Sequence, residues 1–506
     1  MASEGATSNH EERCSLPPHA TLARLPEAEQ KMEEQYDVAI IGAGVAGLAA
    51  AWELLKKGRK EGKEVKLVVV EARERLGGRV NTRALGGEGA LDVGASFIHG
   101  QQNNPVAELL KSHGVMTRHV NWEEGRFCGS ASHGANAVRV ETHADDKYFP
   151  ITEMLDGAKR KWGKSRSGRG KRRAGGSSRG AVDEEPADIS VRELIDGYLL
   201  PAQAQDGAAR FGLEWQLHEC LEADWAADPR DMSARRWGED QQLGGGDCLV
   251  EGGYGQLIEL LQQGVQVRLG CQVHAIVRGN PAEAKGVVIE LASGLSLRAH
   301  RAIVTLPAGV LKANAVEFHP PLPDGFSEAL GLLGVSNLVW AHLLLESPWW
   351  PPALSRQSLV FNLHASSATT WPYILRRDDI PAVAGVPFVI SLGAGGPEAH
   401  RIDGLSDAEL LQELRLVLEQ LTGIQPPESV ALVRSRWAVD PLARGCYSYL
   451  RVGFQPRHHR ILCQSIDDQI FWAGEHTSNT FRATVHGAFI SGLRVAREVF
   501  SQLISN

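Results

Sequence analysis

Residues 36–51 read Tyr36-Asp-Val-Ala-Ile-Ile-Gly42-Ala-Gly44-Val-Ala-Gly47-Leu-Ala-Ala-Ala51. The pattern predicts a buried strand, a glycine turn and a helix, and the apolar run that follows ends on an acid, Glu71. In such a unit Gly42 makes the tight turn, Gly44 lets the backbone approach a pyrophosphate at the helix N-terminus, and Gly47 lets the helix pack on the strand. Glu71 is placed to accept hydrogen bonds from a ribose diol. The stretch therefore predicts dinucleotide binding, without distinguishing FAD from NAD.

A second glycine pair follows directly after the acid. Gly77 and Gly78 allow another close approach of the backbone to the diphosphate, and Arg73 and Arg79 can supply positive charge to it. This second contact segment favours a ligand with an extended diphosphate.

Near the other end of the chain, residues 471–477 read Phe471-Trp-Ala-Gly474-Glu475-His-Thr477 and repeat the pattern of a strand followed by a glycine. They precede a helix predicted from Thr484 to Leu503, whose N-terminus would point at the pyrophosphate or at a flavin pyrimidine. Dinucleotide-contacting segments at opposite ends of one chain suit a long ligand such as FAD.

These motifs form an ordered series that resembles the flavin amine oxidase family, which holds polyamine oxidases, monoamine oxidases and lysine-specific histone demethylases. The Ser-Phe-Ile-His-Gly and Tyr-Ser-Tyr variants are more similar to polyamine oxidases and histone demethylases than to monoamine oxidases. The resemblance covers about residues 36–500, and the further matching motifs are Leu91-Asp-Val-Gly94-Ala-Ser-Phe-Ile-His99-Gly100, Gly252-Gly-Tyr-Gly255, Ala302-Ile-Val-Thr-Leu-Pro307-Ala-Gly-Val-Leu311, Trp437, Asp440-Pro441, Gly445-Cys-Tyr-Ser-Tyr449 and Ala483-Thr-Val-His-Gly-Ala488.

The resemblance implies an α/β fold in which a doubly wound, Rossmann-like FAD-binding domain is interleaved with an α+β substrate domain of mixed sheet and helices. The active site would lie between the two domains. The expected parts are a disordered tail at 1–35, an FAD-binding domain of 36–120, 240–310 and 431–506, a substrate-binding domain of 121–239 and 311–430, and a mobile basic low-complexity insert at 158–185 that buries no apolar surface. Within them we expect helices over 190–235 and 407–423, and short strands at 265–268 and 273–276.

Amine oxidation asks for little acid or base chemistry from the protein, because the cofactor carries the difficult step. The resemblance implies that a neutral amine gives a hydride equivalent to flavin N5, that the imine hydrolyses, and that O2 reoxidises the flavin with release of H2O2. It places Tyr447 and Thr484 as opposite walls of an amine slot, with His99 in the same cavity. His486 is as consistent with a structural cap as with a ligand. The expected cofactor contacts are Gly42, Gly44, Gly47, Glu71, Arg73, Gly78, Arg79, Val273, Trp437, Gly474, Glu475, Thr484 and Val485.

Two positions depart from the family pattern. Where the family has a lysine that holds a water near flavin N5, an ungapped comparison places Trp340, and no lysine follows Lys312 in the sequence. This departure predicts slow reaction with O2. Cys446 stands before the slot tyrosine, where polyamine oxidases usually have serine and monoamine oxidases have a cysteine bonded to the flavin. We favour non-covalent FAD with Cys446 as a packing residue, and keep a covalent link at Cys446 as the alternative.

Composition narrows the class of protein. At 506 residues the chain can bury large cores, and its net charge of −8 and pI near 6.2 argue against a general nucleic-acid binder. The seven cysteines have no CxxC spacing, so we expect neither a metal site nor a disulfide framework. The sequence has no apolar signal segment and no 18-residue apolar run, which predicts a cytoplasmic protein that is not secreted and has no membrane partner. The basic run Lys159–Arg173 leaves nuclear import, or a nucleic-acid or chromatin contact, as the alternative to a solvated insertion, which we favour.

The leading interpretation is a polyamine oxidase that acts with O2 on spermine, spermidine or acetylated forms. A histone lysine demethylase is the first rival, and Thr484 and the basic insert favour it. Against it, the sequence shows no recognisable SWIRM domain and no long coiled-coil insertion, and the basic loop would not attract a basic histone tail. A flavin-bound protein with weak turnover is the second rival, because of Trp340. An L-amino-acid oxidase would need an arginine to hold the substrate carboxylate, for which Arg444 and Arg482 are candidates. A predicted acidic helix face would attract a polyamine, although a solvated face is the simpler explanation; its residues are Glu214, Glu219, Glu222 and Asp224.

Overall fold

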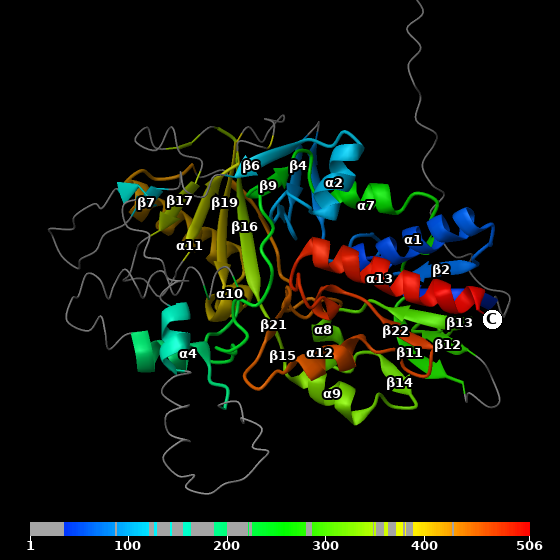
Figure 1. Cartoon of the computed structure of the whole chain (residues 1–506). Coiled ribbons are helices and arrows are strands. Elements are labelled where there is room, and N and C mark those ends of the chain that lie inside the picture. Colours follow the sequence, from blue (N-terminus) through cyan, green and yellow to red (C-terminus); the bar gives the residue numbers. More distant parts are fainter. Residues whose placement is uncertain are drawn as a thin grey trace, which may run out of the picture.

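Two large sheets lie on opposite sides of the molecule, and helices cover each of them (Figure 1). Smaller sheets lie in the region between them. The computed structural model describes residues 35–86, 89–120, 126–128, 142–143, 155–162, 187–199, 221, 225–279, 286–347, 349–350, 359–362, 371–377, 380, 388–427 and 430–505.

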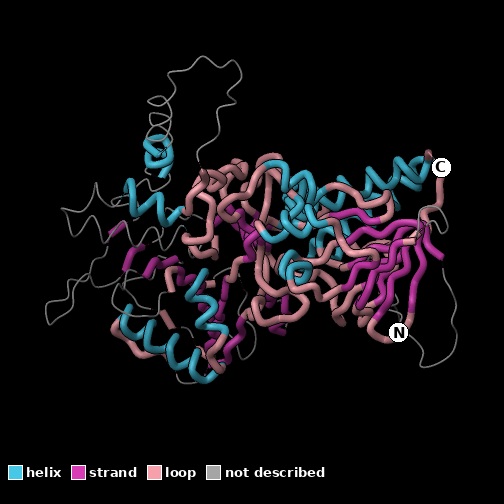
Figure 2. Tube along the Cα trace, turned by 90° about the horizontal axis from the view of Figure 1, so that it is seen from below, coloured by secondary structure: helices cyan, strands magenta, loops and turns pink. Residues whose placement is uncertain are grey.

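The first large sheet is built around the glycine motif. Its strands run in the order β10-β2-β1-β13-β12-β11-β14, with β22 beside β13. Neighbours are parallel from β10 to β13, and β22 is also parallel to β13, whereas β12 is antiparallel to β13 and β11. Most of these strands run side by side at the end of the molecule where α13 ends (Figure 2). The strands are β1 (Gln35–Ile41), β2 (Leu67–Val70), β10 (Val267–Arg268), β11 (Val273–Arg278), β12 (Val287–Leu291), β13 (Ser296–Val304), β14 (Glu317–His319) and β22 (Ile470–Trp472).

Helices cover both faces of this sheet. Along β1, Val38 and Ile40 belong to one hydrophobic core, while Ala39 and Ile41 belong to another, as expected for a strand that is buried on both sides. The doubly wound arrangement predicted from the sequence is therefore confirmed. The first core packs against α1 (Val45–Glu61), α7 (Gly255–Leu261) and α13 (Val485–Ile504), and the second against α8 (Ala308–Lys312), α9 (Asp324–Gly331) and α12 (Pro456–Cys463).

The helices predicted at 407–423 and 484–503 are confirmed as α11 (Asp407–Thr422) and α13. Local signals fix the ends of α11. The Ser406 hydroxyl accepts a hydrogen bond from the Glu409 N–H, and the Glu409 carboxylate accepts one from the Ser406 N–H, which forms a capping box. At the other end Gly423 has φ +69°, the left-handed conformation that commonly ends a helix.

The second large sheet lies on the opposite side of the molecule from the first. Its strands run in the order β20-β16-β19-β18-β17-β7-β8, and all neighbours are antiparallel except β17 and β7. Helices α10 (Gly396–Asp403) and α11 pack with β16, β18 and β19 in a third hydrophobic core. The strands are β7 (Arg126–Cys128), β8 (Thr142–His143), β16 (Leu338–Leu345), β17 (Leu359–Asn362), β18 (Tyr373–Arg376), β19 (Phe388–Gly395) and β20 (Val430–Arg434).

Three small sheets connect segments that are distant in the sequence. In one of them β9 pairs with both β5 and β6, in another β15 pairs with β21, and β3 pairs with β4 in the third. All of these pairs are antiparallel. The remaining elements are β3 (Thr82–Gly86), β4 (Gly89–Asp92), β5 (Phe97–Ile98), α2 (Pro105–Ser112), β6 (Thr117–Val120), α4 (Val191–Leu194), the π-helix η3 (Ile195–Leu199), β9 (Asp247–Val250), β15 (Leu333–Val335), β21 (Ser448–Leu450) and the 3-10 helix η6 (Glu475–Thr477).

The start of the basic insert differs from the prediction. Residues 155–162 form a helix, and its apolar side chains at Leu155, Ala158 and Trp162 are buried in a core that also contains Trp237 and Tyr449. The prediction that the insert buries no apolar surface is therefore wrong for its first turns, because these residues recur at the three- and four-residue spacing of one helix face. The remainder of the basic run, at 163–173, lies outside the described residues.

The helical prediction for 190–235 holds only in part. Helix α4 and the π-helix η3 occupy 191–199, but residues 225–237 form turns and bridges rather than a helix. The acidic residues predicted to line a helix face lie outside the described residues. The two short strands predicted before residue 277 are found as β10 and β11.

The sheets do not follow every expected domain boundary. Strand β14 and helix α9 come after residue 311, yet β14 pairs with β11 in the first sheet and α9 packs in its second core. The division into domains stays a prediction. Among the described helices, none is long and apolar enough to cross a bilayer. The cytoplasmic location, with nuclear import as its alternative, also stays a prediction.

Candidate active site

One elongated cavity of about 1190 Å³ is lined by residues from both large sheets. Gly42 and Glu71 line it on the first sheet, and Trp340 and Tyr373 line it on the second. Of the cofactor contacts and amine-slot residues predicted from the sequence, all except Gly47 are among the lining residues. The cavity therefore brings together, in space, residues predicted separately from distant motifs, although their roles stay predictions.

Gly42, in the turn between β1 and α1, and Gly47, near the start of α1, have no room for a side chain. Gly42 has φ +103°, and a Cβ there would lie 2.6 Å from the Thr305 Oγ1. A Cβ at Gly47 would collide with the Gly42 carbonyl oxygen, so Gly47 is needed for the helix to approach the turn and not for contact with a ligand. Gly44 faces Gly77 across an isolated bridge, and the nearest atom to a Cβ there would be 3.9 Å away. The main chain at Gly44 is thus open to a ligand.

Glu71 ends β2 beside this turn. Its side chain is buried, at 6% exposed, and it lines the cavity. The Ala43 N–H donates to its Oε2 at 2.8 Å, and the Arg73 N–H donates to its Oε1 at 3.0 Å. Each carboxylate oxygen can accept more than one hydrogen bond, so the fixed carboxylate keeps acceptor capacity for a diol. Val273, at the start of β11, lines the same end of the cavity.

The two arginines expected to serve the diphosphate each have an acidic partner. The Arg73 guanidinium lies 2.8 Å from the Asp440 carboxylate, and the Arg79 guanidinium lies 3.0 Å from that of Glu475. Arg79 also donates to the Cys446 carbonyl oxygen at 2.6 Å. These ion pairs fix the positions of the two arginine side chains. The carboxylates neutralise part of the positive charge that the sequence analysis expected to act on the diphosphate.

Glu475, in the C-terminal motif, contacts Arg79, Ser448 and Ala483, which come from other parts of the cavity wall or its surroundings. Its Oε2 accepts hydrogen bonds from the Ser448 hydroxyl at 2.7 Å and from the Ala483 N–H at 3.1 Å. Burial alone would raise the pKa of Glu475, but the Arg79 guanidinium, His476 and the Ser448 hydroxyl outweigh burial and hold that pKa below its ordinary value. Glu475 is therefore an anion that joins segments from three parts of the chain.

Helix α13 begins at the cavity wall. Thr484 is its N-cap: the hydroxyl accepts a hydrogen bond from the Gly487 N–H at 2.9 Å and donates to the Phe481 carbonyl oxygen at 2.8 Å. Gly474 precedes this segment with φ +137°, and its N–H donates to the Ser491 hydroxyl at 2.9 Å. Thr484 and Val485 both line the cavity, which places the start of the helix where the sequence predicted a cofactor contact.

Tyr447 and Trp437 line the cavity close to Cys446. The Cys446 Sγ lies 3.1 Å from the Leu338 nitrogen and 3.3 Å from its carbonyl oxygen, so the thiol is engaged by one backbone unit. Burial raises the pKa of Cys446 to about 12, and the thiol is therefore neutral at physiological pH. These features favour Cys446 as a packing residue, and a covalent link stays the alternative prediction.

His99 lies at the rim and His486 lies inside. The His99 side chain is 50% exposed, and its Nδ1 lies 3.2 Å from the Asp247 Oδ2. His486 packs against the Phe481 ring with centroids 4.9 Å apart. Burial, with the nearby His99, lowers the pKa of His486 to about 4, so its imidazole is neutral near pH 7. The packing favours the structural role for His486 that the sequence left open.

Several lining residues were not predicted from the sequence. Phe97 and Tyr373 flank Trp340, with ring centroids 6.2 and 6.4 Å away. Arg482, which the sequence offered as a carboxylate clamp, instead lies 3.2 Å from the Asp240 carboxylate, and both side chains are nearly buried. Arg444, the other candidate clamp, is exposed and does not line the cavity. Phe97 lies within the Ser-Phe-Ile-His-Gly motif, from which no role was predicted for it. Tyr373 and Asp240 belong to no predicted motif, because strand pairing and loop packing bring them to the cavity.

The lining chemistry fits a dinucleotide. An open main-chain turn at the N-terminus of α1, a fixed carboxylate at the end of β2 and two oriented arginines lie along one cavity. These are the groups that bind a diphosphate and a ribose diol. The part beyond them, between Tyr447 and Trp340, is walled by aromatic side chains.

A family model described as flavin containing amine oxidoreductase matches residues 45–500. The chain belongs to this family. It is 31% identical over 474 residues to polyamine oxidase 3 of Oryza sativa subsp. japonica, covering 91% of this chain and 88% of that protein. It is 28% identical over 495 residues to probable polyamine oxidase 4 of Arabidopsis thaliana, covering 96% and 92%. It is 30% identical over 486 residues to lysine-specific histone demethylase 1 homolog 2 of Arabidopsis thaliana.

Coverage differs between these relatives. The match to the demethylase homologue takes in 91% of this chain but only 58% of that protein, so this chain spans little more than half of it. Among solved structures, wild-type putrescine oxidase bound to putrescine aligns with a TM-score of 0.68 and 19% identity, covering 92% of this chain and 99% of that one. At this identity the likeness shows a shared fold.

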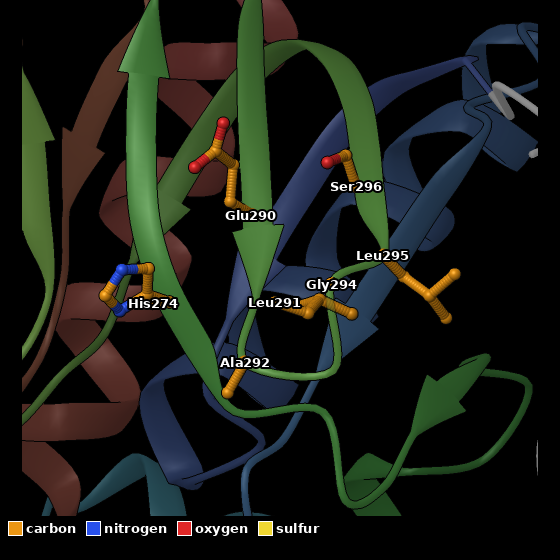
Figure 3. Close-up of a pocket in the computed structure, with 7 residues that line it drawn as sticks. All are labelled: His274, Glu290, Leu291, Ala292, Gly294, Leu295 and Ser296. Carbon is orange, nitrogen blue, oxygen red and sulfur yellow. The ribbon is translucent and has the colours of Figure 1, made fainter.

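A second hollow lies away from this cavity. It measures about 540 Å³ and sits at the turn between β12 and β13, beside the start of β11 (Figure 3). It shares no lining residue with the elongated cavity. Leu295 points away from the turn, and the polar side chains of His274, Glu290 and Ser296 stand apart from one another on separate strands (Figure 3). The hollow has no convergent polar groups that would hold a ligand.

Proposed function

We propose that this chain oxidises an amine, and that the preferred substrate is a polyamine such as spermine, spermidine or an acetylated form. The observation that carries the proposal is the continuity of one cavity, from the glycine turn and Glu71 to the aromatic residues Tyr447 and Trp340. FAD, when bound, supplies the acceptor for the hydride equivalent, and O2 removes the electrons as H2O2.

The chain's own residues would position the amine and exclude water. Tyr447 and Thr484 would form the slot, with Trp340, Phe97 and Tyr373 as further apolar walls. Near these walls His486 is neutral at pH 7, because burial lowers its pKa to about 4, and it therefore adds no positive charge that would repel an ammonium group.

Carboxylates in the same cavity support a substrate with more than one amino group. Asp156, on the helix of residues 155–162, is exposed, and Asp247 lies at the rim beside His99. Such carboxylates attract a polycation by long-range electrostatics. The names and coverage of the polyamine oxidases among the relatives support the same substrate class.

A demethylase-like activity on a methylated lysine side chain is the second candidate. The observation in its favour is the 30% identity to a protein named as a lysine-specific histone demethylase homologue. Against it stands the 58% coverage of that relative, since more than a third of its length has no counterpart in this match.

Anaerobic mixing of the purified holoprotein with a panel of amines tests the proposal. Spermine, spermidine and N1-acetylspermine should bleach the visible flavin absorption faster than a dimethyl-lysine peptide. Faster bleaching by the peptide would favour the demethylase-like activity. If no amine in the panel bleached the flavin, the proposed oxidation would be wrong.

A further inference from the structure

The indole of Trp340, on β16 of the second sheet, lines the cavity. Trp340, Gly393 and Tyr373 are in register on β16, β19 and β18, which are adjacent strands. Side chains in register on neighbouring strands point to the same face of a sheet. The indole and the phenol therefore stand on one face, with a glycine between them.

The indole lies over that glycine. A Cβ at Gly393 would meet the Trp340 Cη2 and Cζ3 at 2.9 Å and its Cζ2 at 3.1 Å. Three consecutive ring atoms at nearly equal distances place the six-membered ring face-on above Gly393, not edge-on. Trp340 and Tyr373 line the cavity whereas Gly393 does not, so the indole covers the glycine and turns its other face to the cavity.

No described lining cation is positioned to compete for this face. The three arginines of the cavity are each held by a carboxylate: Arg73 by Asp440, Arg79 by Glu475, and Arg482 by Asp240. A tryptophan face attracts cations through its quadrupole, more strongly where water is excluded. The flanking rings of Phe97 and Tyr373, at centroid distances of 6.2 and 6.4 Å, extend the apolar surface that alkyl substituents of such a cation would contact.

We infer that the cavity face of Trp340 holds an alkyl-substituted ammonium group of the substrate, one that is not itself oxidised. The residue then selects amines with a second, substituted nitrogen, such as the second internal secondary ammonium of spermine, over diamines with primary ends only. Gly393 is a positioning residue, because its missing side chain lets the indole lie flat. The inference deepens the proposed amine oxidation and rests on it for the identity of the substrate.

Equilibrium binding of choline tests the face without turnover. Choline carries a quaternary ammonium with no lone pair, so it is not a substrate for the proposed reaction, and 3,3-dimethylbutan-1-ol has the same shape without the charge. Calorimetry on the holoprotein should show choline binding more tightly than the neutral alcohol. In Trp340→Leu, choline binding should weaken about ten-fold, the size expected for a desolvated cation on an indole, while the alcohol changes little.

Two controls keep the test specific. Trp52 lies on α1 and does not line the cavity, so Trp52→Leu should leave choline affinity within about two-fold of wild type. Gly393→Ala should weaken choline binding without touching the ligand, because its Cβ displaces the indole, whereas Gly331→Ala places its Cβ in open space and should have no effect.

The outcomes separate the inference from the proposed function. Choline and the alcohol binding equally, or choline binding that is unchanged in both Trp340→Leu and Gly393→Ala, would overturn the inference even if polyamines bleach the flavin. Choline binding that depends on Trp340 supports the ammonium site even if no tested amine is oxidised. If Trp340→Leu does not fold, the wild-type comparison and Gly393→Ala still decide.

Discussion

At the scale of single residues, Trp340 changes the electrostatics of the site. The sequence comparison predicts that Trp340 stands where the family has a lysine, and an indole carries no charge and offers one N–H donor. Its ring lies over Gly393 and is flanked by Phe97 and Tyr373, so it belongs to a packed wall rather than to a mobile side chain. A wall of this kind can position an amine, but it cannot stabilise developing negative charge as a lysine does.

We therefore expect amine to bleach the flavin readily and O2 to restore its colour slowly. Loss of one preorganised electrostatic group typically costs on the order of 10²–10³ in rate. Trp340→Lys should speed the reaction with O2 more than the reaction with amine, and Trp225→Lys, which puts a lysine elsewhere in the cavity, should not. Stopped-flow measurement of the two half-reactions separates the effects. A fast reaction of the natural protein with O2 would mean that another group, such as His99, replaces the lysine.

Cys446 poses a separate question at the same scale. Its thiol is engaged by the Leu338 backbone, and burial raises its pKa to about 12, so little nucleophilic thiolate is present at neutral pH. We expect acid precipitation to leave all of the flavin in the supernatant, for the natural protein as for Cys446→Ser. Yellow colour that stays with the precipitated natural protein, and is absent from the variant, would establish the covalent link instead.

At the scale of elements, helix α13 depends on a cap that also forms the cavity wall. The Thr484 hydroxyl accepts a hydrogen bond from the Gly487 N–H, and removing such a cap typically costs about 1 kcal/mol. Thr484→Ala should lower the thermal midpoint and shift the flavin absorption spectrum, while Thr484→Ser should restore both. Ser406→Ala removes the cap of α11, which contributes no lining residue, and should lower the midpoint alone. Equal spectral shifts in both variants would contradict a local role for Thr484 at the cavity.

Elements whose signals are local were predicted well from the sequence. The β1–turn–α1 unit follows from glycines within a few residues of one another, and α11 follows from its capping box and apolar period. The arrangement of Trp340, Gly393 and Tyr373 could not be predicted in this way. It depends on the register of β16, β19 and β18, in which Gly393 pairs with Trp340, 53 residues earlier, and with Tyr373, 20 residues earlier.

At the scale of the whole molecule, an ion pair between segments near the two ends of the chain lines the cavity. Arg79 and Glu475 are 396 residues apart in sequence, yet their side chains lie 3.0 Å apart and both line the cavity. The sequence identified both residues as cofactor contacts, but it could not reveal that they bind each other. Partners at such separation follow from the completed fold, so the local motifs could not predict this ion pair.

Acid stability also belongs to the whole molecule, because four histidines, three of them buried and His459 half-buried, share one property. Burial lowers the pKa of His342 to about 3, and lowers those of His459, His476 and His486 to about 4, from an ordinary value of 6.5. Between about pH 6.5 and 4 the unfolded chain therefore binds more protons than the folded one, so the free energy of unfolding falls as pH falls through this window.

The thermal midpoint should accordingly drop between about pH 6.5 and 4, and should change less above that window. His342 lies outside the cavity and its Nδ1 is 2.7 Å from the Ser391 hydroxyl, so His342→Gln removes one titrating group while keeping a hydrogen-bonding side chain. Its midpoint should depend less steeply on pH than that of the natural protein, although it can be lower at pH 7. His274→Gln, at an exposed position, serves as the control and should leave the slope unchanged. Parallel pH profiles for the natural protein and His342→Gln would show that this histidine is already protonated, or accessible to water, in the folded chain.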